Sequence, residues 1–516
     1  MTSWFTKKLL GEVNRQKRKR NNNYVLRFTH YVIMSKGKLL LINPWIYDFA
    51  AFNLWIEPIG LFYIASILLQ HGYEITFIDC LDRYHPELLK LQGRDAPELR
   101  SYGCGKYYKE IIEKPEILKH FPRNYGRYGI TFDIFDAELE KQDKPDVVLV
   151  TSKMTYWYPG PFEVIRRVKN RYPDVPLILG GTYATLCYQH AVEHSGADYV
   201  IAGEGEFQTL KLVDALAGNV SDQTFSFPKR KSLIKKKSKG IYSYYSSFPM
   251  DISDYPFPAH DLNRQRDYVA ILTSRGCPMK CTYCATNLLN PAGFRQRRVE
   301  NVLDELEWCY HELGVRNFAF YDDALLLNAK NHIHKILDGI IQRNFRCYFH
   351  TPNSMHAQMI DYDLAPKMYH AGFKTIRISL ETSNSERQKS ASSNKVTNAG
   401  FRRAIENLKA AGFTANDIKA YVMIGLPGQP LQEVRDSIAF IHDCGVQVSL
   451  AEYTPIPGTV EWQRAASEYD FNPDSDPLLH NNTIFLFQTD SVIYKDFEKV
   501  RMFALEGNRK IVKRDA

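Results

Sequence analysis

The sequence predicts an α/β protein with three parts: a doubly wound, Rossmann-like parallel sheet, then a partial (β/α)6 barrel, then a helical C-terminal appendage. Three observations predict this fold class. Strands that are apolar throughout alternate with amphipathic helices, which is the pattern of a parallel sheet covered on both faces. The alternation occurs in two separate stretches, at about 38–215 and about 268–460. A chain of 516 residues is also too long for a single hydrophobic core.

The first stretch supplies the doubly wound sheet. Between its second and third strands, residues 83–143 are rich in Tyr, Arg and Lys and have no clear periodicity. We therefore expect 83–143 to be an insertion at the carboxyl edge of the sheet. The regular elements of this stretch are expected as strands at 39–43, 74–79, 147–151, 177–179 and 199–202, and as helices at 60–70 and 162–171.

The second stretch supplies the barrel, because six strand–helix units follow one another. Its strands are expected at 268–273, 317–321, 346–350, 375–380, 418–424 and 447–453. The chain then divides into a basic arm at 1–33, a first domain at 34–217, a connector at 218–262, a barrel at 263–462 and an extension at 463–516.

The net charge of +8 at pH 7 is concentrated in two places. Residues 1–33 carry eight Lys or Arg and one acidic residue, and residues 229–239 carry seven more basic residues. The rest of the chain is therefore net acidic. Such basic runs are usually solvated tails or loops, so we expect a disordered arm, a folded part that begins at Met34, and no nucleic-acid partner.

Two further features of the sequence bear on location and redox state. No apolar run is long enough for a membrane span, and the N-terminus lacks the apolar core and cleavage site of a secretion signal. We therefore expect a cytoplasmic protein with no membrane partner. In that setting nine cysteines favour thiolate chemistry over a disulfide framework.

Three of the cysteines form a dense motif, R-G-C-P-M-K-C-T-Y-C at 275–284. Cys277, Cys281 and Cys284 place three thiolates within eight residues, directly after an apolar strand. Three thiolates can hold a [4Fe-4S] cluster and leave its fourth iron open. A zinc ribbon would need a second cysteine pair, but the remaining candidates, Cys309, Cys347 and Cys444, are isolated inside predicted elements.

This motif resembles the signature of the radical S-adenosylmethionine (SAM) superfamily, and the resemblance covers about 268–460. It implies that the reduced cluster cleaves SAM to a 5′-deoxyadenosyl radical. Y-T-P-I-P-G-T at 453–459 is similar to the cobalamin-binding branch. Read singly, Asp322 could cap a helix, Glu381 could be a surface residue and G-L-P-G at 425–428 could be a turn. The SAM contacts that the resemblance implies are Tyr283, Asp322, Glu381 and Gly425.

The loops at the carboxyl edge of the first sheet are the second candidate site. The motif G-x-G-x-x-G is absent, which argues against NAD or FAD. Instead the loops read T-S-K-M-T at 151–155, G-G-T-Y-A-T at 180–185 and G-E-G-E at 203–206. Ligands of open α/β sheets bind at this edge, and paired glycines let the backbone lie against a large ligand.

These loops resemble the cobalamin-binding domain that precedes the barrel in one radical SAM branch, over about 38–210. The motif D-x-H-x-x-G, which supplies a histidine to cobalt, is absent, and His71 and His190 lie where structural or exposed histidines are expected. The domain could also be a relic that only shapes a substrate cavity. The resemblance implies a cobalamin nucleotide tail held by Ser152 and Thr182 and lined by Gly180, Gly181, Gly203, Glu204 and Gly205.

The Tyr-rich segment 83–143 has two possible roles that the sequence does not separate. It could cap the corrin or select the substrate. It could also pack only against its own domain.

The two resemblances together imply a cobalamin-dependent radical SAM enzyme. Its expected reaction is C-methylation of an unactivated carbon of a small-molecule substrate, with electrons from a donor such as flavodoxin or ferredoxin. The alternatives are a radical SAM cyclase or rearrangement enzyme without methyl transfer, and a non-catalytic corrinoid or redox sensor. A complete set of SAM-site residues argues against a sensor. A tRNA methylthiotransferase is disfavoured, because a second cysteine triad and a basic C-terminal module are missing.

Overall fold

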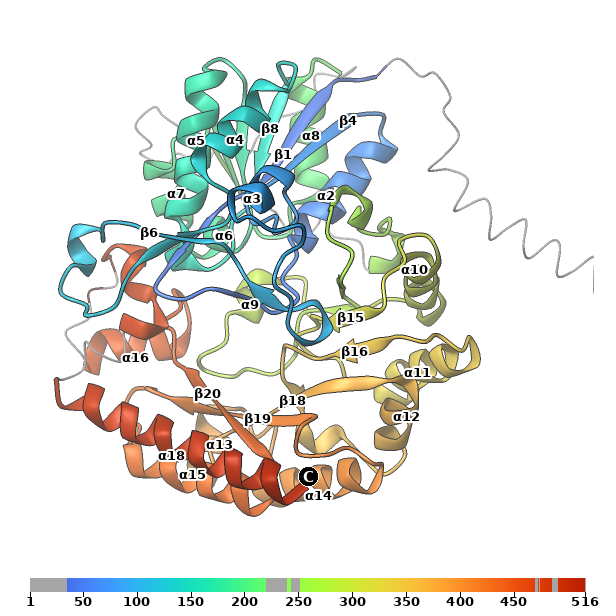
Figure 1. Ribbon diagram of the computed structural model, residues 1–516, viewed down its shortest axis with the longest axis vertical. Coiled ribbons are helices and arrows are strands. Elements are labelled where there is room, and N and C mark those ends of the chain that lie inside the picture. Colours follow the sequence, from blue (N-terminus) through green and yellow to red (C-terminus); the bar gives the residue numbers. More distant parts are fainter. Residues whose placement is uncertain are drawn as a thin grey trace, which may run out of the picture.

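The computed structural model describes residues 35–219, 239–242, 251–468, 472, 474–484 and 491–515. The basic arm, Met34 and the Lys-rich run up to residue 238 lie outside these described residues. Figure 1 shows a sheet with its helices, in blue to green, stacked on a second sheet with its helices, in yellow to red.

The N-terminal sheet has six strands, all parallel, in the order β11-β10-β9-β8-β1-β4. The strand order reverses between β1 and β8, and ligands of doubly wound sheets bind outside such a switch point. Five strands are those predicted, and the sixth, β11, comes from the segment expected to be a connector. The strands are β1 (Lys38–Asn43), β4 (Glu74–Asp79), β8 (Val147–Val150), β9 (Leu177–Leu179), β10 (Tyr199–Ala202) and β11 (Lys239–Tyr242).

Helices cover both faces of this sheet, which explains why its central strands β8 and β9 are apolar throughout. Leu39 and Leu41 face one core, with α2 (Ile59–Gln70) and α8 (Glu206–Leu216). Leu40 faces the other core. That second core is formed by α4 (Phe132–Glu140), α5 (Pro159–Arg171), α6 (Thr182–Leu186) and α7 (Tyr188–His194).

Helix α4 lies inside the segment 83–143 that was expected to be an insertion, so the interruption of the fold ends near residue 131. The nine-residue helix begins after Thr131, whose side chain accepts a hydrogen bond from the Ile134 amide. Its apolar side packs on β1 and β8 like any layer helix.

The rest of the insertion contains α3 (Pro86–Leu91) and short antiparallel strands, and it reaches beyond its own domain. Cys104 packs with Trp55, Tyr268 and Ala319 at the barrel. Tyr125 packs with C-terminal residues of the chain. The strands of the insertion are β5 (Gly105–Lys106), β6 (Lys109–Ile111) and β7 (Gly126–Tyr128), and they pair with one another or with β2 (Ile46–Asp48) and β3 (Phe52–Asn53), which follow β1 in the chain.

The second sheet is the predicted partial barrel, with parallel strands in the order β12-β15-β16-β18-β19-β20. All six predicted strands are present, and a short extra strand, β17 (Met355–His356), pairs with β18. The six are β12 (Val269–Ile271), β15 (Asn317–Phe320), β16 (Tyr348–His350), β18 (Phe373–Glu381), β19 (Ile418–Ile424) and β20 (Gln447–Glu452).

Helices cover the outer face of this sheet and bury every second strand residue. On β18, Ile376, Ile378 and Leu380 belong to that core. Because side chains alternate along a strand, Ser379 and Glu381 face the barrel interior. The helices of this part are α9 (Thr286–Leu289), α10 (Val299–His311), α11 (Ile333–Gln342), α12 (Leu364–Ala371), α13 (Ser385–Ser390), α14 (Asn398–Ala410) and α15 (Leu431–Asp443).

The described part of the C-terminal extension contains the end of α16 (Val460–Glu468), a short 3-10 helix at Pro477–His480 and the long α18 (Ser491–Asp515). Helix α18 packs on β20 and α15. The Asn508 side chain donates to the Val448 carbonyl at 2.9 Å and accepts from its amide at 2.8 Å, so it covers the open edge of β20. None of the described helices is long and apolar enough to cross a bilayer.

Candidate functional site

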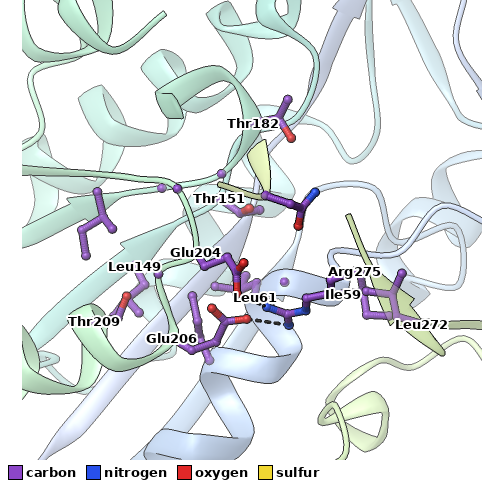
Figure 2. Close-up of a pocket in the computed structure, with 18 of the residues that line it drawn as sticks. Ile59, Leu61, Leu149, Thr151, Thr182, Glu204, Glu206, Thr209, Leu272 and Arg275 are labelled. Atoms are coloured by element: carbon purple, nitrogen blue, oxygen red, sulfur yellow. Dashed lines mark hydrogen bonds and ion pairs between the residues drawn. The ribbon is translucent and has the colours of Figure 1, made fainter. Parts of the chain in front are cut away.

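A cavity of about 310 Å³ lies between the two sheets (Figure 2). Its walls come from the carboxyl-edge loops of the N-terminal sheet and from two loops of the barrel. The loop after β12 contributes Ser274, Arg275 and Asn290, and the loop after β15 contributes Asp323. The carboxyl edges of the two sheets therefore face each other across this cavity.

The residues that the cobalamin resemblance singled out meet at this cavity. Ser152 lies just behind the wall, where its hydroxyl donates to the Gly180 carbonyl at 2.7 Å and accepts from the Ala184 amide at 3.2 Å. The Ser152 side chain therefore ties two loops together. The predicted residues that line the cavity directly are Gly180, Gly181, Thr182, Gly203, Glu204 and Gly205.

The cavity wall suits a large ligand with a flat apolar part. Ile59, Leu61 and Ile64 of α2 contribute apolar surface. A Cβ atom at Gly60 would meet nothing within 4 Å, and one at Gly180 would meet only the Ile201 carbonyl oxygen, at 3.9 Å. The glycines thus leave a cradle that side chains would fill, and this fits the nucleotide tail of a corrinoid.

Gly181 is required for a different reason. Its φ is 99°, and a Cβ atom there would stand 2.2 Å from the Ser152 carbonyl oxygen. Only glycine fits this close crossing of the two loops.

Neither candidate histidine lines the cavity. His71 is exposed at the end of α2, and its ring nitrogen lies 2.7 Å from the Ile67 carbonyl oxygen. His190 in α7 lies among Tyr158, Phe162 and Tyr183 in the core on the opposite face. Burial lowers the pKa of His190 to about 4. These positions agree with the expectation that both are exposed or structural.

Glu204 does more than line the cavity, because it joins the two domains. Its carboxylate pairs with Arg275, at 3.1 Å, and with Arg295. The neighbouring Glu206 pairs with Arg275 at 2.6 Å, as Figure 2 shows. Burial opposes the charge on Arg275, but Glu206 and Glu204 raise its pKa. The carboxylate of Glu204 is therefore engaged by the barrel.

The three motif cysteines lie on the loop 276–294. A two-residue antiparallel ladder of β13 (Ser274–Arg275) and β14 (Arg295–Gln296) closes its base. The loop needs glycine at 276, where φ is 79° and a Cβ atom would stand 2.6 Å from the Gly293 carbonyl oxygen. We call 276–294 the cysteine loop.

The thiols of the cysteine loop are close enough to influence one another. Burial raises the pKa of Cys277 to about 11, and the thiols of Cys281 and Cys284 add to the rise. Within the described residues, no three His, Cys, Asp or Glu side chains are gathered around one ion-sized centre. A cubane differs from a single ion because each thiolate binds its own iron, so the loop fits a cluster by its donor set.

Glu381, at the end of β18, anchors a group of polar residues beside the cysteine loop. Its carboxylate lies 2.5 Å from the Lys395 ammonium and accepts from the Ser392 hydroxyl at 2.5 Å. Glu381 also has a φ of 67°, a strained backbone region for a residue other than glycine, of the kind found at functional sites. Burial raises the pKa of Tyr283, and Glu381 is the next largest cause, so the two side chains are neighbours.

Gly425 is linked to the same group by its neighbour in the chain, Leu426. Leu426 packs with Tyr283 and Tyr453. Two buried polar atoms nearby, Ser379 Oγ and His356 Nδ1, have no hydrogen-bond partner. Orphaned polar atoms facing the barrel interior fit a polar ligand such as SAM.

Asp322 follows the second barrel strand, β15. Its carboxylate accepts from the hydroxyls of Thr273, at 2.7 Å, and Ser274, at 2.5 Å. Burial raises the pKa of Asp322 to about 6. The side chain thus braces the end of β12, which leads into the cysteine loop.

The sequence analysis missed Lys395, Ser392, His356, Arg275 and Arg295. Arg275 and Glu204 stand inside the two motifs, R-G-C and G-E-G-E, so their opposite charges were a visible signal. Lys395 gave no signal, since only the fold brings it to Glu381.

A doubly wound sheet whose carboxyl edge faces a partial barrel with a three-cysteine loop defines a two-domain radical SAM architecture. The sequence profiles agree, because the "Radical SAM superfamily" matches 271–441 and the "B12 binding domain" matches 132–211. The chain therefore carries a radical SAM domain that is preceded by a B12-binding domain.

Several named proteins are similar in sequence to this chain over most of its length. An uncharacterized methyltransferase of Pyrococcus horikoshii is 26% identical over 347 residues, which is 64% of this chain and 71% of the relative. The cytidylyl-2-hydroxyethylphosphonate methyltransferase of Streptomyces wedmorensis is 22% identical over 463 residues, 82% of this chain and 80% of the relative. Anaerobic magnesium-protoporphyrin IX monomethyl ester cyclases also match.

Among solved structures, the chain is similar to the radical SAM methyltransferase TsrM from Kitasatospora setae with cobalamin and a [4Fe-4S] cluster bound. The TM-score is 0.60 at 17% identity, over 84% of this chain and 75% of that one. At this identity the likeness concerns the fold.

Proposed function

We propose that this protein is a cobalamin-dependent radical SAM methyltransferase that methylates an unactivated carbon of a small-molecule substrate. One observation carries the proposal: the cavity lined by the cobalamin-type loops also borders the cysteine loop. A methyl donor and a radical source held at facing edges can act on one substrate, because proximity and orientation are what radical capture requires.

The cofactors of this family are a [4Fe-4S] cluster, SAM and cobalamin. We propose Cys277, Cys281 and Cys284 as the cluster ligands. When bound, the cluster and SAM supply a carbon-centred radical, and the corrinoid supplies the methyl group. The protein's own task is to orient these groups and to exclude water from them.

For SAM, we propose a site formed by Tyr283, Glu381 and Gly425, with Lys395 added from the structure. The Lys395 ammonium keeps the Glu381 carboxylate charged and fixed in place. A fixed carboxylate is suited to hold the amino group or the ribose of SAM. We also propose Asp322 as a SAM contact. The hydroxyls of Thr273 and Ser274 hold its carboxylate in place beside the strand that leads into the cysteine loop.

For cobalamin, we propose that Gly180, Gly181, Thr182, Gly203 and Gly205 border the nucleotide tail. Ser152 supports them by holding the Gly180 loop. Glu204 supports them through its ion pairs with the barrel. Cobalt receives no histidine from the chain in this proposal.

Three further expectations remain proposals. The electron donor is a small redox protein such as flavodoxin or ferredoxin, and the location is cytoplasmic. The domain limits are proposed at 34–217 and 263–462, with β11 added to the first sheet.

The test uses methyl-deuterated SAM, a reductant and a small-molecule extract of the source cells with the reconstituted full chain. The proposal predicts a product that carries the deuterated methyl group, with S-adenosylhomocysteine and 5′-deoxyadenosine formed in near-equal amounts. A product that forms with 5′-deoxyadenosine alone and carries no label would refute methylation.

That second outcome would favour the alternative function, a cyclase or rearrangement enzyme. The observation that supports this alternative is the match to the cyclases named above. The two functions share the cluster and the SAM site, so only the fate of the methyl group separates them.

A further inference from the structure

The Glu204 carboxylate of the N-terminal domain anchors both ends of the cysteine loop. One oxygen of Glu204 meets Arg275 at 3.1 Å, and the other meets Arg295. These two arginines stand opposite each other in the ladder of β13 and β14. Because this ladder closes the base of 276–294, Glu204 holds both ends of the cysteine loop.

Arg275 receives further support from the N-terminal side. Glu206 lies 2.6 Å from its guanidinium. The rings of Tyr63, in α2, and Tyr255 lie 4.8 and 4.9 Å from its central carbon. Arg275 and Glu204 are both only 9% exposed. Arg275 thus contacts Glu204 with one guanidinium nitrogen and Glu206 with the other. The planar guanidinium fixes the directions of both charge-assisted contacts, and these contacts fix the orientation of the loop.

The residues of this link also form part of the cavity wall. Glu204, Glu206 and Arg275 all line the cavity of about 310 Å³, and Figure 2 shows Arg275 and Glu206 side by side there. Gly203 and Gly205 flank Glu204 and line it too. A ligand in the cavity therefore touches the groups that hold the cysteine loop.

We propose that Arg275 is a positioning residue that couples the two cofactor sites: a corrinoid tail in the cavity orders Glu204 and Glu206, and these order the cysteine loop through Arg275. The inference rests on the proposed function and deepens it. Coupling between two sites is reciprocal. An iron-loaded cysteine loop therefore raises the affinity for cobalamin by the same factor by which bound cobalamin raises the affinity of the loop for iron.

The experiment compares the dissociation constant of cobalamin for the full chain with and without reconstituted iron. We expect wild-type protein to bind cobalamin at least about fivefold tighter when iron-loaded, the lower end of typical coupling between sites. The ratio of the two dissociation constants, iron-free over iron-loaded, measures the coupling. In Arg275→Met this ratio falls to near one, although cobalamin still binds. Arg275→Lys keeps the positive charge but has a single side-chain nitrogen in place of the two that contact Glu204 and Glu206. We therefore expect an intermediate ratio for this variant.

Two comparisons isolate the nucleotide tail and the particular arginine. Cobinamide, which lacks the tail, should bind wild-type protein with a ratio near one. Arg298→Met is the matched control, because Arg298 is 60% exposed and pairs with Asp251 close to β14. It should keep the wild-type ratio. Glu206→Gln removes one partner of Arg275 and leaves Glu204 in place, so it tests the link if Arg275→Met fails to fold.

The outcomes separate the inference from the function on which it rests. Equal cobalamin affinity of iron-loaded and iron-free wild-type protein would overturn the coupling and leave the proposed function standing. An unchanged ratio in folded Arg275→Met or in Glu206→Gln would overturn the role of Arg275. Failure of the wild-type protein to bind cobalamin in either state would instead contradict the proposed function.

Discussion

Lys395 and Glu381 form a buried ion pair beside the cysteine loop, with 2.5 Å between the ammonium nitrogen and a carboxylate oxygen. Glu381 ends the fourth strand of the barrel, and Lys395 follows α13. Burial opposes the charge on Lys395, but Glu381 and, after it, the Cys281 thiol raise its pKa. The pair thus places a fixed carboxylate and a fixed ammonium next to the thiols.

Removing Lys395 should disable the SAM site while the cluster stays in place. Lys395→Met leaves the buried Glu381 carboxylate without its cation. Removing one partner of a buried ion pair typically lowers the free energy of unfolding by about 3–5 kcal/mol. We expect SAM affinity to fall at least about tenfold, which corresponds to about 1.4 kcal/mol. Isothermal titration with SAM measures it. The matched control is Lys389→Met, since Lys389 pairs with Glu386 on the surface; equal losses in both variants would contradict the assignment.

The cysteines should divide into two classes. Cys277→Ala, Cys281→Ala and Cys284→Ala should each lose the cluster and SAM cleavage, because a cubane with one open iron needs all three thiolates. Cys309→Ala, Cys347→Ala and Cys444→Ala should retain both. Iron content and the visible absorption of anaerobic protein distinguish the classes. A requirement for Cys309, Cys347 or Cys444 as strict as that for Cys284 would refute the open-iron arrangement.

Two adjacent glycines should respond differently to alanine. Gly181→Ala forces a Cβ atom to within 2.2 Å of the Ser152 carbonyl oxygen at a φ of 99°, so it should lower the melting temperature by several degrees. Gly180→Ala has room in the protein and should leave stability unchanged. Its methyl group enters the cavity, so it should weaken cobalamin binding. A Gly180→Ala protein that binds cobalamin like wild type would show that the ligand lies elsewhere.

Stability should fall at alkaline pH because of His260. Glu57 and Glu305 each approach its ring at 3.3 Å, and although burial opposes the charge they raise its pKa to about 9. An unfolded histidine has a pKa of about 6.5. The stabilisation is therefore complete below about pH 6.5 and is lost as the pH rises to about 9, a change on the order of 3 kcal/mol.

Urea unfolding at a series of pH values measures this loss. His260→Gln should be less stable than wild type at pH 6 and should show a flatter dependence above it. If His260→Gln keeps the wild-type slope between pH 6.5 and 9, another group is responsible.

The sequence predicted the central strands of the N-terminal sheet well because they are buried on both sides and apolar throughout, as at 147–150. It missed α4 because nine residues inside an irregular segment carry little periodic signal. It missed β11 because the segment around Lys239 reads as a charged loop.

The same distinction applies to the site. Cys277 and the glycine loops are local motifs, so the sequence alone identified them. The partners of Glu204 and Glu381 come from distant parts of the chain and depend on how two sheets are stacked. The hydroxyls of Thr273 and Ser274, which donate to the Asp322 carboxylate, likewise come from another strand and gave no signal in the sequence.

The central claim is that the corrinoid and the cluster occupy facing edges of one cavity, and a measurement of magnetic coupling between them tests it most directly. The full chain is loaded with cob(II)alamin and a reduced [4Fe-4S] cluster and studied by pulsed electron paramagnetic resonance. We expect the cob(II)alamin signal to show dipolar broadening and fast relaxation that vanish in the cluster-free Cys277→Ala protein. Two independent signals, each unchanged by the presence of the other centre, would contradict the shared cavity.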